Sequence, residues 1–116
     1  AHEVARALGV HSFFTERVDG KMSIRRGFTV EKGERVIIVE DVVTTGVSTK
    51  ETAEALVAAG ATVAGYACIV DRSGGASALP GLVSLLAVEA KTWAEFECPL
   101  CKKGVPAVKP GSRPGR

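Results

Sequence analysis

The sequence predicts an α/β fold with a parallel sheet, and three observations lead to this prediction. Residues 36–39 form a continuous β-branched run, which is typical of a strand that is buried on both faces. A helical pattern follows, with an apolar face formed by Ala53, Leu56 and Val57, and it stops at Gly60. Residues 62–70 then form a second apolar run. A strand, a helix and a strand joined by short loops indicate parallel strands.

The remaining elements follow from the same patterns of apolar and turn-forming residues. In chain order, we expect a helix over residues 1–8 stopped by Gly9, a strand over residues 11–17, a turn at Asp19-Gly20, a loosely alternating segment over residues 22–30, a turn over residues 31–34, a third buried strand over residues 82–88 and a short helix over residues 92–96.

Composition narrows the class of protein. The 116 residues are enough for one compact domain. A net charge of +2, from 15 basic and 13 acidic residues, is too balanced to predict a nucleic-acid partner. The sequence contains neither an apolar run of the roughly 18 residues that a bilayer requires nor a secretory signal pattern. Its three cysteines argue against a disulfide framework, so we expect the reducing cytoplasm.

The start of the chain predicts that it is part of a longer protein. Ala1 is not a start methionine, and a helical stripe of Val4, Ala5 and Leu8 is already under way. We therefore expect that N-terminal elements of the domain are missing. We divide the chain into a partial core over residues 1–97 and a tail over residues 98–116 that is rich in Cys, Pro and Lys.

The end of the first buried strand is the candidate site. Glu40 and Asp41 are followed by a short loop with Thr44, Thr45 and Gly46, and then by a helix. In open parallel sheets, ligands bind at the carboxyl ends of strands, and a helix N-terminus favours a phosphate. The two carboxylates suit sugar hydroxyls or a nearby divalent cation. The alternative is a plain strand–turn–helix with hydroxyl caps, including a capping box of Ser48 and Glu51, and chemistry alone does not separate the two.

A family resemblance does separate them. Residues 39–46, VEDVVTTG, resemble the phosphoribosyl-pyrophosphate signature of the type I phosphoribosyltransferases. The resemblance implies a parallel-sheet, Rossmann-like core. Further segments are similar to the orotate phosphoribosyltransferase family, in a bacterial branch with a Cys-Pro-Leu-Cys tail: FTER at residues 14–17, RRGF at 25–28, VDRSGG at 70–75, CPLC at 98–101 and KPGSR at 109–113.

The resemblance also implies roles for residues. Glu40 and Asp41 would bind the ribose hydroxyls of phosphoribosyl pyrophosphate, and residues 44–48 would hold its 5-phosphate. Arg72 would bind the orotate carboxylate. A mobile catalytic loop over about residues 16–28 would close over the pyrophosphate. The implied catalytic residues are Lys21, Arg17 and Asp41, with Arg25 or Arg26 as further loop cations; the sugar-pyrophosphate site is Glu40, Asp41, Val42, Val43, Thr44, Thr45, Gly46, Val47 and Ser48; and the orotate site is Thr44 and Arg72.

The implied activity is transfer of ribose 5-phosphate from phosphoribosyl pyrophosphate to orotate. The products are orotidine 5-monophosphate and pyrophosphate, in pyrimidine (UMP) biosynthesis. The resemblance implies Mg²⁺ held mainly by the substrate, without direct protein ligands, and a homodimer without nucleic-acid or membrane partners. Two alternatives stay open: a type I phosphoribosyltransferase for a purine or for uracil, and a non-catalytic protein that senses phosphoribosyl pyrophosphate.

Several residues admit a second interpretation. This branch usually carries glycine where Val47 stands, and a β-branched residue would be strained if the position needed a positive φ. Lys21 could be a solvated loop lysine, and Arg72 a surface arginine beside a turn. Trp93 and Phe96 are expected to pack on the sheet or at an interface. Lys102, Lys103 and Lys109 are expected in a solvated tail.

The cysteines pose a separate question. Cys98 and Cys101 have metal-ligand spacing, but a zinc site needs two further ligands. We expect reduced thiols, with a zinc-ribbon module or a zinc site completed by a second subunit as the alternatives. Cys68 lies inside an apolar run and is expected in the core.

Overall fold

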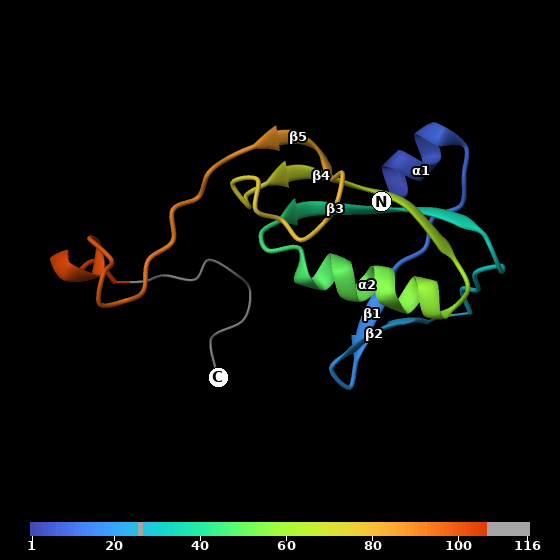
Figure 1. Cartoon of the computed structure of the whole chain (residues 1–116), viewed down its shortest axis with the longest axis horizontal. Coiled ribbons are helices and arrows are strands. Elements are labelled where there is room, and N and C mark those ends of the chain that lie inside the picture. The colour runs from blue at the N-terminus through green and yellow to red at the C-terminus, as the bar shows by residue number, and fades with distance from the viewer. Residues whose placement is uncertain (26, 107–116) are drawn as a thin grey trace.

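The computed structural model describes residues 1–25 and 27–106. Arg26, Lys109 and the segment 109–113 singled out above lie outside the described residues. The elements are helix α1 (His2–Leu8), strands β1 (Thr15–Val18), β2 (Lys21–Ile24) and β3 (Arg35–Val43), helix α2 (Val47–Ala58), strands β4 (Thr62–Asp71) and β5 (Val83–Ala87), and a 3-10 helix, η1 (Cys101–Lys103) (Figure 1).

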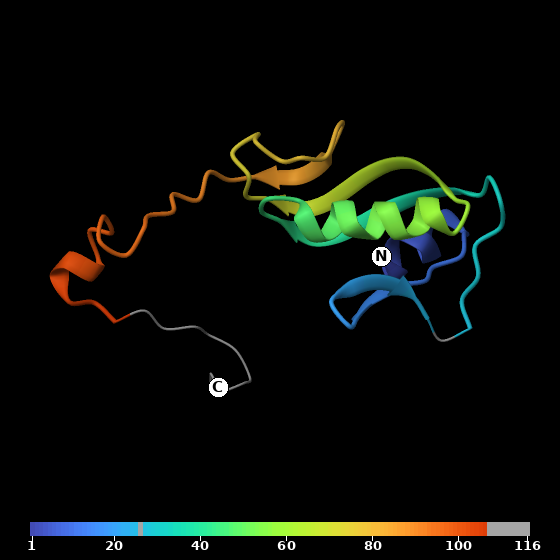
Figure 2. The same cartoon turned by 60° about the horizontal axis from the view of Figure 1, so that its bottom comes forward.

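The main sheet has the order β3-β4-β5, and both pairs of strands are parallel. Ile38 pairs with Tyr66, and Cys68 pairs with Ser84 on the far side of β4. Helix α2 connects β3 to β4 and lies along one face of the sheet (Figures 1 and 2). The predicted α/β fold and its parallel strands are therefore confirmed.

The core lies between the sheet and α2. Val36 and Ile38 of β3 pack with Ala53 and Leu56 of α2 in one cluster of buried residues. A second cluster joins Val43, Leu79 and Cys68, so the prediction of a core Cys68 is confirmed.

The prediction that the strand over residues 36–39, now part of β3, is buried on both faces is wrong. On the face turned away from α2, Ile37 is 57% exposed, Ile69 55% and Leu85 85%. Side chains alternate between the two faces of a strand, and α2 covers one face only. We call Ile37, Ile69, Val83 and Leu85 the open sheet face.

Strands β1 and β2 form an antiparallel hairpin that packs against α2. Its turn is the predicted Asp19-Gly20, where both residues have positive φ, 48° and 82°, as a two-residue hairpin turn requires. The hydroxyls of Thr15 and Thr52 are 3.2 Å apart and join the hairpin to the helix. The hairpin strands are shorter than the expected segments over residues 11–17 and 22–30, and the expected loop over residues 16–28 is largely this hairpin.

Of the two helices expected near the ends of the chain, the first is present and the second is absent. Helix α1 ends at Gly9, whose φ of 66° is left-handed, as predicted. The expected helix over residues 92–96 is absent. Glu89 forms an isolated antiparallel bridge with Ser73, and the chain beyond it runs away from the sheet as far as residue 106, with turns and η1 as its regular features (Figure 1). Trp93 is 49% and Phe96 78% exposed, so neither side chain is buried against the sheet, and their packing at an interface stays a prediction.

Helices in the described part of the chain lack the length and apolar character needed to cross a bilayer.

Candidate active site

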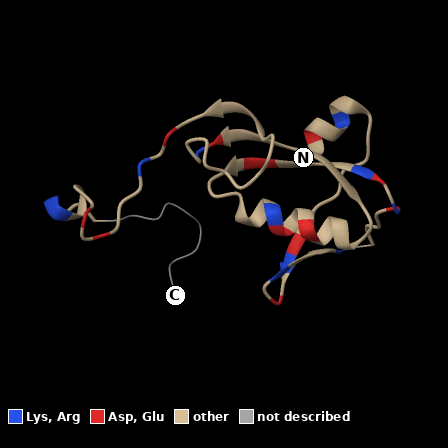
Figure 3. Ribbon diagram, in the orientation of Figure 1, with Lys and Arg blue, Asp and Glu red and all other residues tan. Residues whose placement is uncertain are grey.

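The acidic pair lies within β3 rather than after it. The strand continues through Glu40 and Asp41 to Val43, because the ladder with β4 runs as far as the pair Val43 and Asp71. Neighbouring strand residues face opposite ways, so Glu40 is half-buried while Asp41 is exposed. One Asp41 carboxylate oxygen accepts a hydrogen bond from the Val42 N–H at 2.7 Å. Figure 3 shows acidic residues in this part of β3.

Burial raises the pKa of the Glu40 carboxyl, and the neighbouring Asp41 carboxylate raises it further, while the N-terminal amine acts in the opposite sense. A carboxylate in this position is partly desolvated and crowded by a like charge, and the N-terminal amine offsets these effects only in part. It therefore favours hydrogen-bond donors or a cation brought by a ligand.

The loop after β3 turns at Gly46. Its φ is 79°, and a Cβ built there would lie 2.9 Å from Cγ of Leu79. A residue with a side chain would be strained by the left-handed backbone and would also clash with Leu79. Gly46 lets the chain enter α2 over this buried leucine.

Two expectations about the start of α2 are settled by this geometry. The predicted capping box is wrong, because Gly46 is the N-cap and Ser48 already lies inside the helix without a side-chain cap bond. Val47 is the first residue of α2, and Asp19 alone among the described non-glycine residues has a positive φ. The substitution of Val for Gly at this position therefore causes no backbone strain.

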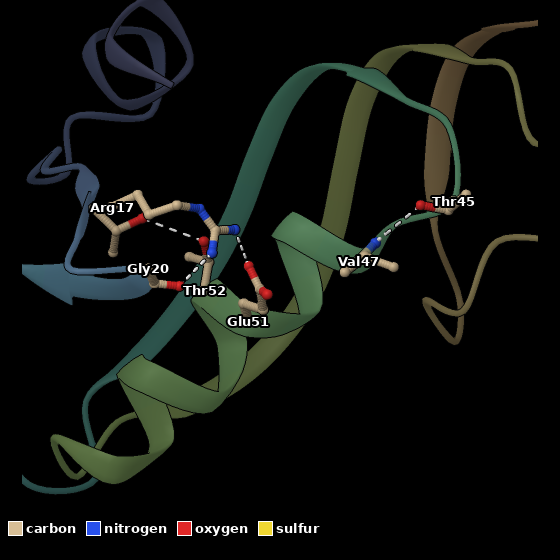
Figure 4. Close-up of polar contacts among 7 residues, drawn as sticks. Arg17, Gly20, Thr45, Val47, Glu51 and Thr52 are labelled. Atoms are coloured by element: carbon tan, nitrogen blue, oxygen red, sulfur yellow. Dashed lines mark hydrogen bonds and ion pairs between the residues drawn. The ribbon is translucent and has the colours of Figure 1, made fainter.

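The loop before α2 and the first residues of the helix, 44–48, form a polar site that is open to solvent, and we call this site the cradle. Thr44, Thr45 and Ser48 are all exposed, and the Val47 N–H donates to Oγ1 of Thr45 at 3.5 Å (Figure 4). The first N–H groups of any α-helix have no acceptor within the helix and carry the positive end of its dipole. Together with three hydroxyls, this arrangement can bind an anion such as a phosphate.

Arg72 lies beside this cradle. It follows β4, and its backbone N–H donates to the carbonyl of Val43 at 2.8 Å. The Ala78 N–H donates to the carbonyl of Thr45 at 3.3 Å, so the loop after β4 is held against the loop after β3 at two points. The carboxyl ends of the parallel strands thus bring Arg72 and residues 40–48 to one edge of the sheet.

A cavity of about 470 Å³ opens next to Arg72, and Glu89, Lys91 and Trp93 also line it. Sequence reasoning missed Lys91 and Trp93. They follow β5, whose carboxyl end lies at the same edge as those of β3 and β4, so applying the strand-end rule to the third strand could have found them.

Asp71 is held by its own loop. Ser73 donates to its carboxylate through the hydroxyl and through the backbone N–H, the latter at 2.8 Å. These hydrogen bonds lower the pKa of Asp71, which keeps the carboxylate charged beside Arg72 and fixes the direction in which the chain leaves β4.

The predicted loop cations Arg17 and Lys21 lie on the hairpin, within the segment expected for them. Nη1 of Arg17 donates to the Gly20 carbonyl at 2.6 Å, and its Nη2 forms an ion pair with Glu51 of α2 (Figure 4). Glu51 lies four residues after Val47, about one helical turn beyond the cradle. Lys21 is exposed at the start of β2, and Arg25 is exposed just after β2.

Across residues 1–25 and 27–106, groups of three or more His, Cys, Asp and Glu side chains placed to hold a metal ion are absent. The adjacent carboxylates of Glu40 and Asp41 offer hard oxygen atoms of the kind that Mg²⁺ prefers. Two carboxylates cannot by themselves satisfy an octahedral ion, so a magnesium ion here would need to take most of its ligands from water and a bound ligand.

Comparison with known proteins agrees with this geometry. Residues 3–99 match the family model described as "Phosphoribosyl transferase domain". The chain belongs to the phosphoribosyl transferase domain family. The match covers β3, the cradle, Arg72 and all the residues that line the cavity.

Within the phosphoribosyl transferase family, the chain is similar to proteins named orotate phosphoribosyltransferase. It is 54% identical over 114 residues to the one from Pelotomaculum thermopropionicum, covering 97% of this chain and 60% of that protein. It is 52% identical over 115 residues to the one from Caldanaerobacter subterraneus subsp. tengcongensis, with the same coverage. It is 54% identical over 112 residues to the one from Chlorobaculum parvum, covering 96% of this chain and 58% of that protein. The chain thus spans about 60% of the length of the curated relatives it matches.

Proposed function

We propose that this protein transfers ribose 5-phosphate from phosphoribosyl pyrophosphate to orotate, giving orotidine 5-monophosphate and pyrophosphate. The observation that carries the proposal is the placement of Arg72 beside the acidic strand end and the anion cradle of α2, tied to them by the Arg72 to Val43 hydrogen bond. Similarity of more than 50% to proteins named orotate phosphoribosyltransferase supports the choice of base.

The sugar phosphate would occupy the cradle. The 5-phosphate would accept hydrogen bonds from the first N–H groups of α2 and from the hydroxyls of Thr44, Thr45 and Ser48. The ribose hydroxyls would then lie near Glu40 and Asp41, which can only accept hydrogen bonds when ionised. The raised pKa of Glu40 fits a carboxylate that gains from such donors.

Arg72 would recognise the base. A planar guanidinium matches a carboxylate with two parallel hydrogen bonds, and orotate differs from uracil by a carboxylate group. The cavity next to Arg72 also contains Lys91 and Trp93, which add a second cation and an aromatic wall. Thr44 would contact the base from the side of the cradle.

Mg²⁺ is the proposed cofactor, held mainly by the substrate. Glu40 and Asp41 would interact with it through bound water rather than as direct ligands. When bound, it would neutralise charge on the pyrophosphate as the bond to C1 of the ribose breaks. Catalysis by the chain itself would rest on positioning the two substrates and on electrostatic stabilisation.

Arg17 and Lys21 would supply cations to the leaving pyrophosphate. In the structure Arg17 pairs with Glu51, one turn beyond the cradle. Closing over the pyrophosphate would require Arg17 to exchange the Glu51 carboxylate for a phosphate oxygen, an equally good partner for a guanidinium. Such a closing loop would also exclude water from the site.

The test uses full-length protein expressed from the complete reading frame. Orotate absorbance is followed with phosphoribosyl pyrophosphate and magnesium, and parallel reactions contain uracil, hypoxanthine or adenine. We expect consumption of orotate that requires magnesium and falls at least about 100-fold in kcat/KM in Arg72→Ala. Arg72 is exposed in the structure, and its removal would abolish the paired charge-assisted hydrogen bonds proposed to bind and position the orotate carboxylate. Arg35→Ala, an exposed arginine at the opposite end of β3, is the matched control.

The other outcomes discriminate the alternatives. Consumption of another base while orotate is untouched would assign a purine or uracil enzyme. Binding of phosphoribosyl pyrophosphate without turnover of any base would favour the sensor.

We also propose that the protein acts as a homodimer in the cytoplasm. The open sheet face, with Leu85 85% exposed, supports association, because contiguous exposed apolar surface favours burial against a partner. Sedimentation of the full-length protein at several concentrations would test the dimer.

A further inference from the structure

The segment beyond the sheet carries two thiols in direct contact. A side-chain hydrogen bond joins Cys98 and Cys101. The backbone around them folds into tight turns: Cys98 N–H donates to the Ala94 carbonyl at 2.9 Å, and Lys102 N–H donates to the Cys98 carbonyl at 3.1 Å. The second bond spans four residues, as in one turn of α-helix, and therefore brings residues 98 and 101 to one side of the turn.

The two sulfur atoms have different surroundings. The backbone N–H of Cys101, then the Cys101 thiol and the N–H of Leu100, donate to the sulfur of Cys98 and lower the pKa of this thiol. Contact with Cys98 raises the pKa of Cys101. A thiol whose sulfur receives backbone N–H groups at the start of a helical turn is the more reactive member of a pair.

Access differs between the three cysteines. Cys98 is half-buried and Cys101 exposed, whereas Cys68 is buried in the core. The pair lies far from the sheet along the tail, next to the basic residues at its far end (Figures 1 and 3). Among the described residues, clusters that could complete a metal site around the pair are absent. This arrangement leaves a reactive thiol with a second thiol in reach.

We propose that Cys98 and Cys101 form a dithiol site that undergoes thiol–disulfide exchange with small-molecule disulfides. The Cys98 thiolate attacks one sulfur of the disulfide, its S–S bond breaks, and one thiolate leaves and takes up a proton. The Cys101 thiolate then attacks the Cys98 sulfur and releases the second thiol. The protein dithiol is oxidised to one Cys98–Cys101 disulfide, and the small disulfide is reduced to two thiols. The site is separate from the proposed transferase site.

The experiment exposes reduced full-length protein to glutathione disulfide and maps the products by mass spectrometry. Trypsin cuts after Lys91 and Lys102, so both thiols fall in one peptide, residues 92–102. In wild type we expect this peptide to lose two hydrogen atoms, and dithiothreitol to restore them. In Cys101→Ser the internal disulfide is lost, and glutathione stays on Cys98. In Cys98→Ser the internal disulfide is also lost, and Cys101 is modified more slowly than Cys98 is in Cys101→Ser. Cys68→Ala is the matched control and should behave as wild type.

Three results would overturn the proposal. Glutathione could remain on both cysteines of the wild type, or the peptide could become linked to another peptide or stay unmodified. A parallel sample with a chelator addresses zinc: oxidation only after chelation, with release of stoichiometric zinc, would assign a metal site completed by other residues instead. Orotate turnover is not part of the readout, so this test and the test of the proposed function can fail separately.

Discussion

Gly46 is the residue whose geometry is most restrictive. It combines a left-handed φ of 79° with a van der Waals contact to Leu79 that leaves no room for a Cβ. We expect Gly46→Ala to lower the free energy of unfolding by about 2–4 kcal/mol, from backbone strain and overpacking together. Gly81 also has a positive φ, 69°, but open space around it, so Gly81→Ala should cost only the strain, about 1–2 kcal/mol. Equal losses in urea unfolding would contradict the role of Leu79.

Glu40 should make stability depend on pH. Its pKa is raised in the folded state, so the folded protein holds this proton more tightly than the unfolded chain does. The stabilisation by the protonated carboxyl is present at acidic pH and is lost as the pH rises through the raised pKa. The gain in stability from Glu40→Gln should therefore grow from acidic to neutral pH, as measured by denaturant unfolding.

Asp41→Asn is the comparison for that prediction. Burial is the larger cause of the Glu40 shift and the Asp41 charge the smaller one, so the Asp41 variant should show the same trend more weakly. A difference between wild type and Glu40→Gln that does not vary with pH would contradict the assignment. Both variants should lose turnover, since both remove a proposed partner of the ribose.

At the scale of elements, the Arg17–Glu51 pair attaches the hairpin to α2. Both side chains are partly exposed, 45% and 36%, so we expect a coupling energy of about 0.2–1 kcal/mol that decreases with added salt. A double-mutant cycle with Arg17→Ala and Glu51→Gln measures this coupling. Arg17→Ala with Glu54→Gln, an exposed carboxylate on the same helix, is the control cycle and should give a coupling near zero. A large, salt-independent coupling would show that the pair is buried in solution.

The elements that the sequence predicted well are those defined by local patterns. Strands β3, β4 and β5 and helix α2 all follow from apolar periodicity, since burial against a neighbouring layer produces that periodicity. The start of α2 was mistaken because Glu51, the expected capping partner, is taken by Arg17, which lies 34 residues away. The prediction of a short helix over residues 92–96 is wrong because the chain leaves the sheet there, and an apolar helix face would have no surface to pack against.

The candidate site was predictable to the same degree. The meeting of residues 40–48 with Arg72 follows from parallel strands, whose carboxyl ends share an edge. The contact of Leu79 with Gly46 depends on the path of a loop, which residue patterns do not encode. Lys91 and Trp93, in contrast, could have been found by following the third strand to its carboxyl end. The ion pair that holds Arg17 on α2 is a long-range contact of the same kind.

At the scale of the whole molecule, the open sheet face should govern solution behaviour. Val83 is 66% and Leu85 85% exposed, with Ile37 and Ile69 on the same face. We expect the 116-residue chain on its own to self-associate, and Leu85→Lys to shift it toward monomer while changing stability by less than about 0.5 kcal/mol. Sedimentation velocity measures this. Val57→Lys, on α2 and 57% exposed, is the control, and an equal effect of both substitutions would contradict the role of this face.

Two hydrogen bonds join the loop after β4 to the carbonyls of Val43 and Thr45. They couple the conformation of the cradle to that of the segment around Arg72. Ordering either loop lowers the entropic cost of ordering the other. The two proposed substrates should then bind with positive cooperativity, and thermodynamic reciprocity requires that each lowers the dissociation constant of the other by the same factor.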